Sequence, residues 1–125
     1  MWTDDWVGIS YHEMGRGPES YDCLGLFVAL QSARFERSIF DPLCTTDEAI
    51  QREIAARQKR LWEPVETARE GDAVMFRVYR APVHLGFALD DRRMLHTEKA
   101  TGSLIEEFRG SRWGQRLEGI YRYVG

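Results

Sequence analysis

The chain has 125 residues, of which 43% are hydrophobic and 30% are charged, and its formal net charge is −3 at pH 7. This size and composition are typical of a globular protein, so we expect residues 1–125 to form a single domain. The charge balance argues against nucleic acid or an anionic membrane surface as a partner, and every apolar run is too short to span a bilayer.

The front of the chain predicts a short helix, a loop and a central helix. The opening MWTDDWVG lacks the basic and apolar regions of a signal peptide, so we expect synthesis in the cytoplasm without one. Residues 4–9 favour a short helix, and residues 10–20 contain the glycines and proline that are typical of a loop. From Cys23 to about Phe35, apolar residues occur nearly all round the helical projection, which predicts a central and largely buried helix.

A second long helix is expected over residues 45–62. Thr45 and Glu48 have the spacing of a capping box at its start. Pro64 is expected to end it, because proline cannot continue a helix. We expect this helix to be an amphipathic cover over one side of the core.

After Pro64 the hydrophobic pattern changes from helical to alternating. Five strands are predicted, over residues 70–80, 83–91, 93–98, 103–108 and 117–124. The second and third of these are expected to form a tight hairpin whose turn centres on Asp91. Helices followed by a meander of antiparallel strands indicate an α+β domain with helices packed on a sheet.

The first residue of the predicted central helix is a cysteine, Cys23. The free N–H groups and the dipole at a helix start stabilise a thiolate, so we expect the pKa of Cys23 to fall. His84 and His96 lie on the two strands of the predicted hairpin, where they would be close in space, and a Cys-His-His triad is geometrically plausible. From spacing alone, a buried core cysteine and two hydrogen-bonded structural histidines remain an equal alternative.

The remaining cysteine, Cys44, adds little to the chemistry. Two cysteines are too few for a disulfide scaffold, and a regulatory Cys23–Cys44 bond is a minor alternative. The three histidines and two cysteines lack the spacing of a zinc site, so no metal is expected. The arginine-rich segment 109–116, which contains Trp113, is interpreted as a solvated edge or a docking surface.

Taken together, the motifs resemble the NlpC-type cell-wall cysteine peptidases, which have a papain-like core. The resemblance covers nearly the whole chain and depends on the order of WVGISY, YDCLGL, GDAVMF, HLGFAL with LHTE, and GIYRY. It implies a central helix that carries the cysteine and packs on an antiparallel sheet of about five strands. It also implies hydrolysis of an amide in peptidoglycan stem peptides, often between D-γ-glutamyl and diaminopimelate, without an organic cofactor.

The resemblance assigns a role to each site residue. Cys23 would be the nucleophile, His84 the general base and acid, and His96 the residue that orients His84. Tyr11 matches a family tyrosine that ends the first helix and faces the cysteine, and it would help to stabilise the oxyanion. Asp22 matches the aspartate before the cysteine, where it would contact the amino end of a stem peptide or cap the helix.

One position departs from the family, because Leu24 occupies the place after the cysteine where serine is usual. The motif DCLGL, the helix at 45–62 and the ending RWGQRLEGIYRY look like the phage tail-associated branch. This branch implies a protein that is carried in a virion tail, with peptidoglycan and other tail proteins as partners. Two alternatives stay open: a tail-assembly protein with a weakly active or inactive peptidase fold, and a different amide or ester substrate.

Overall fold

The computed structural model describes residues 1–39, 41, 56–77, 84–110 and 112–125. Beside a helical segment at 56–61, the elements in chain order are η1 (Trp2–Trp6), β1 (Ser10–Tyr11), β2 (Ser20–Tyr21), α1 (Cys23–Phe35), β3 (Trp62–Val65), β4 (Ala73–Phe76), β5 (His84–Ala88), β6 (Arg93–Glu98), β7 (Gly102–Glu107), η3 (Gly114–Arg116) and β8 (Leu117–Tyr123). The labels η1 and η3 denote 3-10 helices.

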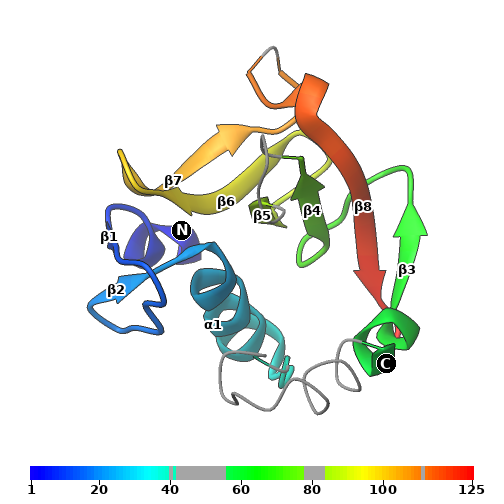
Figure 1. The fold of residues 1–125 in the computed structure, drawn as a ribbon, viewed down its shortest axis with the longest axis horizontal. Coiled ribbons are helices and arrows are strands. Elements are labelled where there is room, and N and C mark those ends of the chain that lie inside the picture. The colour runs from blue at the N-terminus through cyan, green and yellow to red at the C-terminus, as the bar shows by residue number, and fades with distance from the viewer. Residues whose placement is uncertain (40, 42–55, 78–83, 111) are drawn as a thin grey trace.

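The main sheet has six antiparallel strands in the order β3-β8-β4-β5-β6-β7. Helix α1 lies against this sheet and contacts β5 and β6, as Figure 1 shows. The α+β architecture with a central helix on an antiparallel sheet is therefore confirmed. No helix in the described part of the chain combines the length and the apolar character that a membrane crossing requires.

The sixth strand, β3, corrects the expected extent of the second helix. Helical structure ends at residue 61, and Trp62–Val65 pairs with β8. Pro64 lies inside this strand rather than after a helix. The strand is at the edge of the sheet, where a residue without an N–H group is tolerated. The predicted capping box at Thr45 and Glu48 falls outside the described residues.

The N-terminal elements also differ from the expectation. The short helix is a 3-10 helix at Trp2–Trp6 instead of an element at 4–9. The predicted loop at 10–20 is bounded by β1 and β2, which pair in parallel with Tyr11 opposite Tyr21. The family resemblance had implied that Tyr11 ends a helix. This is wrong, because Tyr11 is a strand residue.

The predicted hairpin between β5 and β6 is confirmed, including its register. Phe87 pairs with Leu95 and Ala88 pairs with Met94, which centres the turn on Asp91. This register brings the start of β5 beside the end of β6. It therefore determines that His84 and His96 lie close together.

The sheet is buried on both faces because its central strands alternate between two apolar clusters. One cluster joins α1 to the sheet and includes Leu26, Leu30 and Phe87. The other lies on the opposite face and is built around Phe76 and Trp113. Since successive strand residues point to opposite faces, neighbours such as Phe87 and Ala88 belong to different clusters.

Two polar contacts fix helix α1 along its length. At its start, the Asp22 carboxylate accepts a hydrogen bond of 2.7 Å from the backbone N–H of Gly25. Further along, the fully buried Gln31 donates from Nε2 to the carbonyl oxygen of Gly71 at 2.7 Å. Buried hydrogen-bonded groups of this kind specify one position for the helix, and so they also fix the position of its first residue.

Candidate active site

Cys23 is the first residue of α1 and opens into a cavity of about 220 Å³. The cavity is lined by Tyr11, Cys23, His84, Thr97, Glu98, Lys99, Trp113 and Arg116. The backbone N–H of Leu85 interacts with the thiol of Cys23, so the sulfur lies beside β5, next to His84. The structure thus brings Tyr11, Cys23 and His84 to one cavity from three different elements.

His96 lies behind His84 and is buried, with 1% of its surface exposed. The Nε2 atom of His84 is 2.7 Å from Nδ1 of His96. On its other side, Nε2 of His96 is 2.9 Å from Oε1 of Glu106 on β7. The two imidazoles and the carboxylate form a continuous chain of hydrogen bonds.

The carboxylate at the end of this chain sets the direction of every hydrogen bond in it. An ionised carboxylate can only accept, so His96 must donate from Nε2 to Glu106. A neutral His96 then has an unprotonated Nδ1, which accepts the N–H of Nε2 of His84. Nδ1 of His84 is consequently the bare nitrogen of that ring, and it can take a proton from a thiol.

Arg112 holds the carboxylate of Glu106 in place. Its guanidinium donates to both oxygens of Glu106, at 3.0 and 2.8 Å, and to both oxygens of Glu98, at 2.9 and 2.8 Å. Burial alone would raise the pKa of Glu106, but the hydrogen bonds from His96 and Arg112 lower it below its usual value. Glu106 is therefore ionised at neutral pH, as the direction of the chain requires.

His96, Glu98 and Glu106 also place their ligand atoms within 4.8 Å of one another, which is close enough for a shared metal ion. The guanidinium of Arg112 already lies against both carboxylates at hydrogen-bond distance. A cation at this position would meet the positive charge of Arg112, so this cluster does not fit a metal.

Trp113 packs against both histidines. Its ring stacks on His84 with centroids 4.9 Å apart and an angle of 17° between planes, and it meets His96 edge-on at 5.2 Å. Trp113 is only 3% exposed, so the interpretation of residues 109–116 as a solvated edge is wrong for this residue. The exposed arginines of the segment, such as Arg109 and Arg112, form ion pairs with carboxylates.

The pKa of Cys23 does not fall, as its position at a helix start had led us to expect. Burial raises the pKa of the thiol above its usual value, and the negative charge of Asp22 also raises it. The backbone N–H groups of Leu85, Leu24 and Cys23 favour the thiolate but do not outweigh the burial. The expectation was wrong because the helix start is covered by other elements, and desolvation of a charge exceeds the effect of a few aligned dipoles.

The pKa of His84 is also shifted in the direction that disfavours the charged form. Burial lowers the pKa of His84 to about 4, and the neighbouring His96 contributes to this shift. Burial likewise lowers the pKa of His96. A thiol and a neutral imidazole are therefore the resting forms at neutral pH, where transfer of the proton to Nδ1 of His84 would produce the thiolate.

These shifts predict how alkylation of Cys23 depends on pH. Only the thiolate reacts with iodoacetamide, and a raised thiol pKa leaves little thiolate at pH 7. We expect the rate at Cys23 to rise about tenfold per pH unit from pH 6 to pH 9. Peptide mass spectrometry would measure labelling of Cys23 separately from Cys44. A rate that is already constant between pH 5 and pH 8 would instead show a thiolate–imidazolium pair and contradict this assignment.

Tyr11 reaches the same cavity from strand β1. It is half-buried, and burial raises the pKa of its hydroxyl, as do a thiolate at Cys23 and the negative charge of Asp22. The hydroxyl is therefore protonated at neutral pH and can donate a hydrogen bond. A donor in this position can stabilise negative charge on an oxygen bound beside Cys23.

Asp22 acts as the N-cap of α1, which was one of its two expected roles. Its carboxylate accepts from the backbone N–H of Gly25 at 2.7 Å and of Met14 at 3.1 Å. The Arg16 guanidinium forms an ion pair with it at 2.7 Å. Contact of Asp22 with the amino end of a substrate stays a prediction, and Asp22 is not among the residues that line the cavity.

Sequence reasoning did not find Glu106 or Trp113. The register of β6 with β7 pairs His96 with Leu104, so Glu106 is the diagonal neighbour of His96 on the same face of the sheet. A register estimate for this second hairpin could have identified Glu106. The role of Trp113 could not be found in this way, because it depends on how the loop before β8 folds back over the sheet.

Comparison with known proteins identifies relatives of this fold. The sequence pattern of the NlpC/P60 family matches residues 8–122. A Staphylococcus aureus protein described as similar to a lipoprotein of the NLP/P60 family is 20% identical, with a TM-score of 0.68 over 96% of this chain and 38% of its own. An NlpC/P60 family protein from Bacillus cereus is 18% identical, with a TM-score of 0.67 over 95% of this chain and 37% of its own.

A third solved structure matches over most of both chains. The NlpC/p60 domain of the peptidoglycan hydrolase SagA is 17% identical, with a TM-score of 0.64 over 94% of this chain and 89% of that domain. The chain spans less than two fifths of the first two proteins. No curated protein sequence matches it.

Proposed function

This chain belongs to the NlpC/P60 family, and we propose that it is a cysteine peptidase that hydrolyses an amide bond in peptidoglycan stem peptides. The observation that carries the proposal is the chain of hydrogen bonds from His84 through His96 to Glu106, beside the cavity that holds Cys23. The name of SagA, a peptidoglycan hydrolase with the same fold, supports the choice of substrate class.

The first half of the reaction forms an acyl-enzyme. Nδ1 of His84 accepts the proton of the Cys23 thiol while the sulfur attacks the carbonyl carbon of the amide. The carbonyl oxygen becomes an oxyanion, which the Tyr11 hydroxyl and the backbone N–H of Cys23 stabilise by hydrogen bonds. His84 then returns the proton to the departing amine, and a thioester with Cys23 remains.

The second half releases the product. His84, neutral again, removes a proton from a water molecule, which attacks the thioester carbonyl. The tetrahedral intermediate collapses to a carboxylic acid, and the sulfur leaves with the proton from His84. His96 keeps His84 in the required tautomer through both halves, and Glu106 does the same for His96.

We place the scissile bond between D-γ-glutamyl and diaminopimelate, and residues 1–125 act as a single peptidase domain. The motif DCLGL and the ending RWGQRLEGIYRY support a phage or prophage tail-associated protein, whose partners are peptidoglycan and other tail proteins. Such a protein is made in the cytoplasm and reaches the cell wall with the virion tail.

The test is incubation of the purified chain with defined stem peptides, read by mass spectrometry. L-Ala-γ-D-Glu-diaminopimelate and longer forms offer both the proposed bond and its neighbours. We expect one new amine and one new carboxylate at the D-γ-glutamyl bond. If neither these peptides nor whole sacculi are cleaved, the peptidase assignment fails. A tail-assembly role for an inactive fold would then take its place, and it is tested by pull-down of other tail components.

The hydrogen-bond chain predicts a specific effect of Glu106→Gln. A glutamine amide can donate to Nε2 of His96, which would move the His96 proton to Nδ1 and oppose the N–H of His84. We expect kcat to fall about 10- to 100-fold, with little change in KM, because His84 then favours the wrong tautomer. Glu106→Asp keeps an accepting carboxylate and should recover part of the rate.

The matched control is Glu107→Gln, which removes the neighbouring exposed carboxylate at the end of β7. It should leave kcat unchanged. If Glu106→Gln and Glu107→Gln lower the rate equally, the effect is one of general charge and the tautomer argument is wrong.

A further inference from the structure

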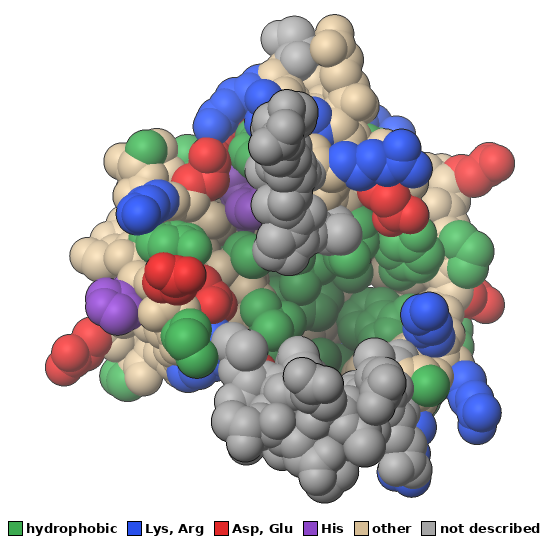
Figure 2. Space-filling view, viewed as in Figure 1, with side chains coloured by type: hydrophobic (Ala, Val, Ile, Leu, Met, Phe, Trp, Pro, Cys, Tyr) green, Lys and Arg blue, Asp and Glu red, His purple; other side chains and the backbone are tan. Residues whose placement is uncertain are grey.

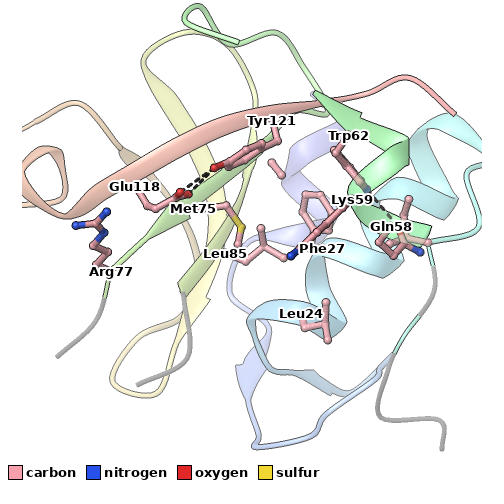
Figure 3. A pocket seen from close by; sticks show the side chains of 12 residues that line it. Leu24, Phe27, Gln58, Lys59, Trp62, Met75, Arg77, Leu85, Glu118 and Tyr121 are labelled. Carbon is pink, nitrogen blue, oxygen red and sulfur yellow. Dashed lines mark hydrogen bonds between the residues drawn. The ribbon is translucent and has the colours of Figure 1, made fainter. Parts of the chain in front are cut away.

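A second and larger cavity, of about 580 Å³, begins next to the active site. Leu24 and Leu85 line it, and they are the chain neighbours of Cys23 and His84. It extends between α1 and the strands β4 and β8 to Trp62 at its far end (Figure 3). A molecule in this cavity would therefore lie beside the segments that carry the thiol and the imidazole, while Cys23 and His84 themselves line the smaller cavity.

The walls of this cavity are mostly apolar. Beyond the two leucines, Phe27, Met75 and Trp62 contribute large hydrophobic surfaces. Figure 2 shows hydrophobic side chains gathered in a hollow on the face that it presents. A cavity of this volume and lining is typical of sites for small organic molecules with a substantial apolar part.

Two cationic side chains also face this cavity. Lys59 and Arg77 both line it, and Figure 3 shows the Lys59 side chain extending toward Phe27 and Leu85. Neither forms an ion pair with a carboxylate among the residues that the structure describes. Among the described residues of the lining, the acidic side chain is that of Glu118, which accepts hydrogen bonds from the Tyr121 hydroxyl at 2.8 and 2.9 Å.

An apolar cavity with two exposed cationic side chains in its lining is complementary to an apolar molecule with a negative charge. Burying hydrocarbon against Phe27, Trp62 and Met75 is favourable, and a carboxylate would complete an ion pair with Lys59. A stem peptide is polar along its length and leaves these apolar walls without a partner.

We propose that the larger cavity is a binding site for an amphiphilic carboxylate, with the hydrocarbon chain between Leu24 and Trp62 and the carboxylate at Lys59. The site adjoins Cys23, so its occupant covers the thiol. The inference does not require the proposed peptidase activity.

The first experiment measures binding of 11-(dansylamino)undecanoate to the intact chain by fluorescence, with displacement by dodecanoate. We expect saturable binding of one molecule, and at least tenfold weaker displacement by methyl dodecanoate, which has no charge. Dodecanoate at saturation should also slow the labelling of Cys23 by iodoacetamide at least fivefold. Binding should persist in Cys23→Ala, which separates this site from catalysis.

Two variants locate the binding site. Lys59→Glu should weaken the binding of dodecanoate at least tenfold and leave the binding of the methyl ester unchanged. Arg92→Glu, which makes the same change in charge at an exposed position, is the control. Met75→Asp should weaken the binding of both ligands, since it places a carboxylate on the apolar wall. Circular dichroism would verify that each variant is folded.

The proposal is overturned by an absence of saturable binding, by equal affinities for acid and ester, or by binding that leaves Cys23 labelling unchanged. Unaltered affinity in both Lys59→Glu and Met75→Asp would place the ligand elsewhere and would also overturn it. Failure of peptide hydrolysis with dodecanoate still bound would contradict only the proposed function.

Discussion

Cys23→Ala is expected to abolish hydrolysis of stem-peptide amides, lowering turnover about 10³- to 10⁶-fold. The sulfur of Cys23 forms the proposed acyl intermediate, and alanine has no nucleophilic atom that could replace it. The fold should survive because Asp22 caps the helix independently of the residue that follows it. We expect the free energy of unfolding to change by less than about 1 kcal/mol. Mass spectrometry of peptide products and urea unfolding measure the two effects.

Cys44→Ala is the matched control, since it removes the other cysteine of the sequence. It should retain full turnover. Cleavage that persists in Cys23→Ala, or that disappears equally in Cys44→Ala, would contradict the assignment of Cys23 as nucleophile.

The strands and their hairpin could be predicted from the sequence because both depend on local patterns. Alternation of apolar residues located β4 to β8, and the Asp90–Arg92 turn set the register between β5 and β6. Strand β3 was missed because its four residues contain Pro64, which reads as a helix stop when the neighbouring strand β8 is unknown. A strand of this length is determined by its pairing, which is a tertiary property.

The candidate site shows the same division between local and tertiary information. The motifs around Cys23 and His84 located the thiol and the imidazole, and hairpin geometry located His96. The predicted direction of the pKa shift of Cys23 was wrong, because burial of the helix start depends on the packing of the whole sheet. Trp113 was assigned to a solvated edge because Arg109 and Arg112 surround it, yet it covers the imidazoles.

His84→Ala is expected to lower turnover about 10³- to 10⁴-fold, with a different signature from that of Cys23→Ala. The thiol remains, but burial raises its pKa and no base is left to remove its proton at neutral pH. The residual activity should therefore increase with pH up to pH 9 in proportion to the thiolate. The wild-type rate should be constant above about pH 6, because the pKa of His84 is lowered to about 4 and the base is already neutral there.

The exposed His12 provides the control, and His12→Ala should keep the wild-type rate and pH profile. Added imidazole should restore part of the activity of His84→Ala, because the substitution leaves space in the cavity that His84 and Trp113 line. A His84→Ala variant whose activity stays independent of pH would mean that another group deprotonates Cys23. The chain of hydrogen bonds through His96 and Glu106 would then have a structural role only, since it is proposed to act on the thiol through Nδ1 of His84.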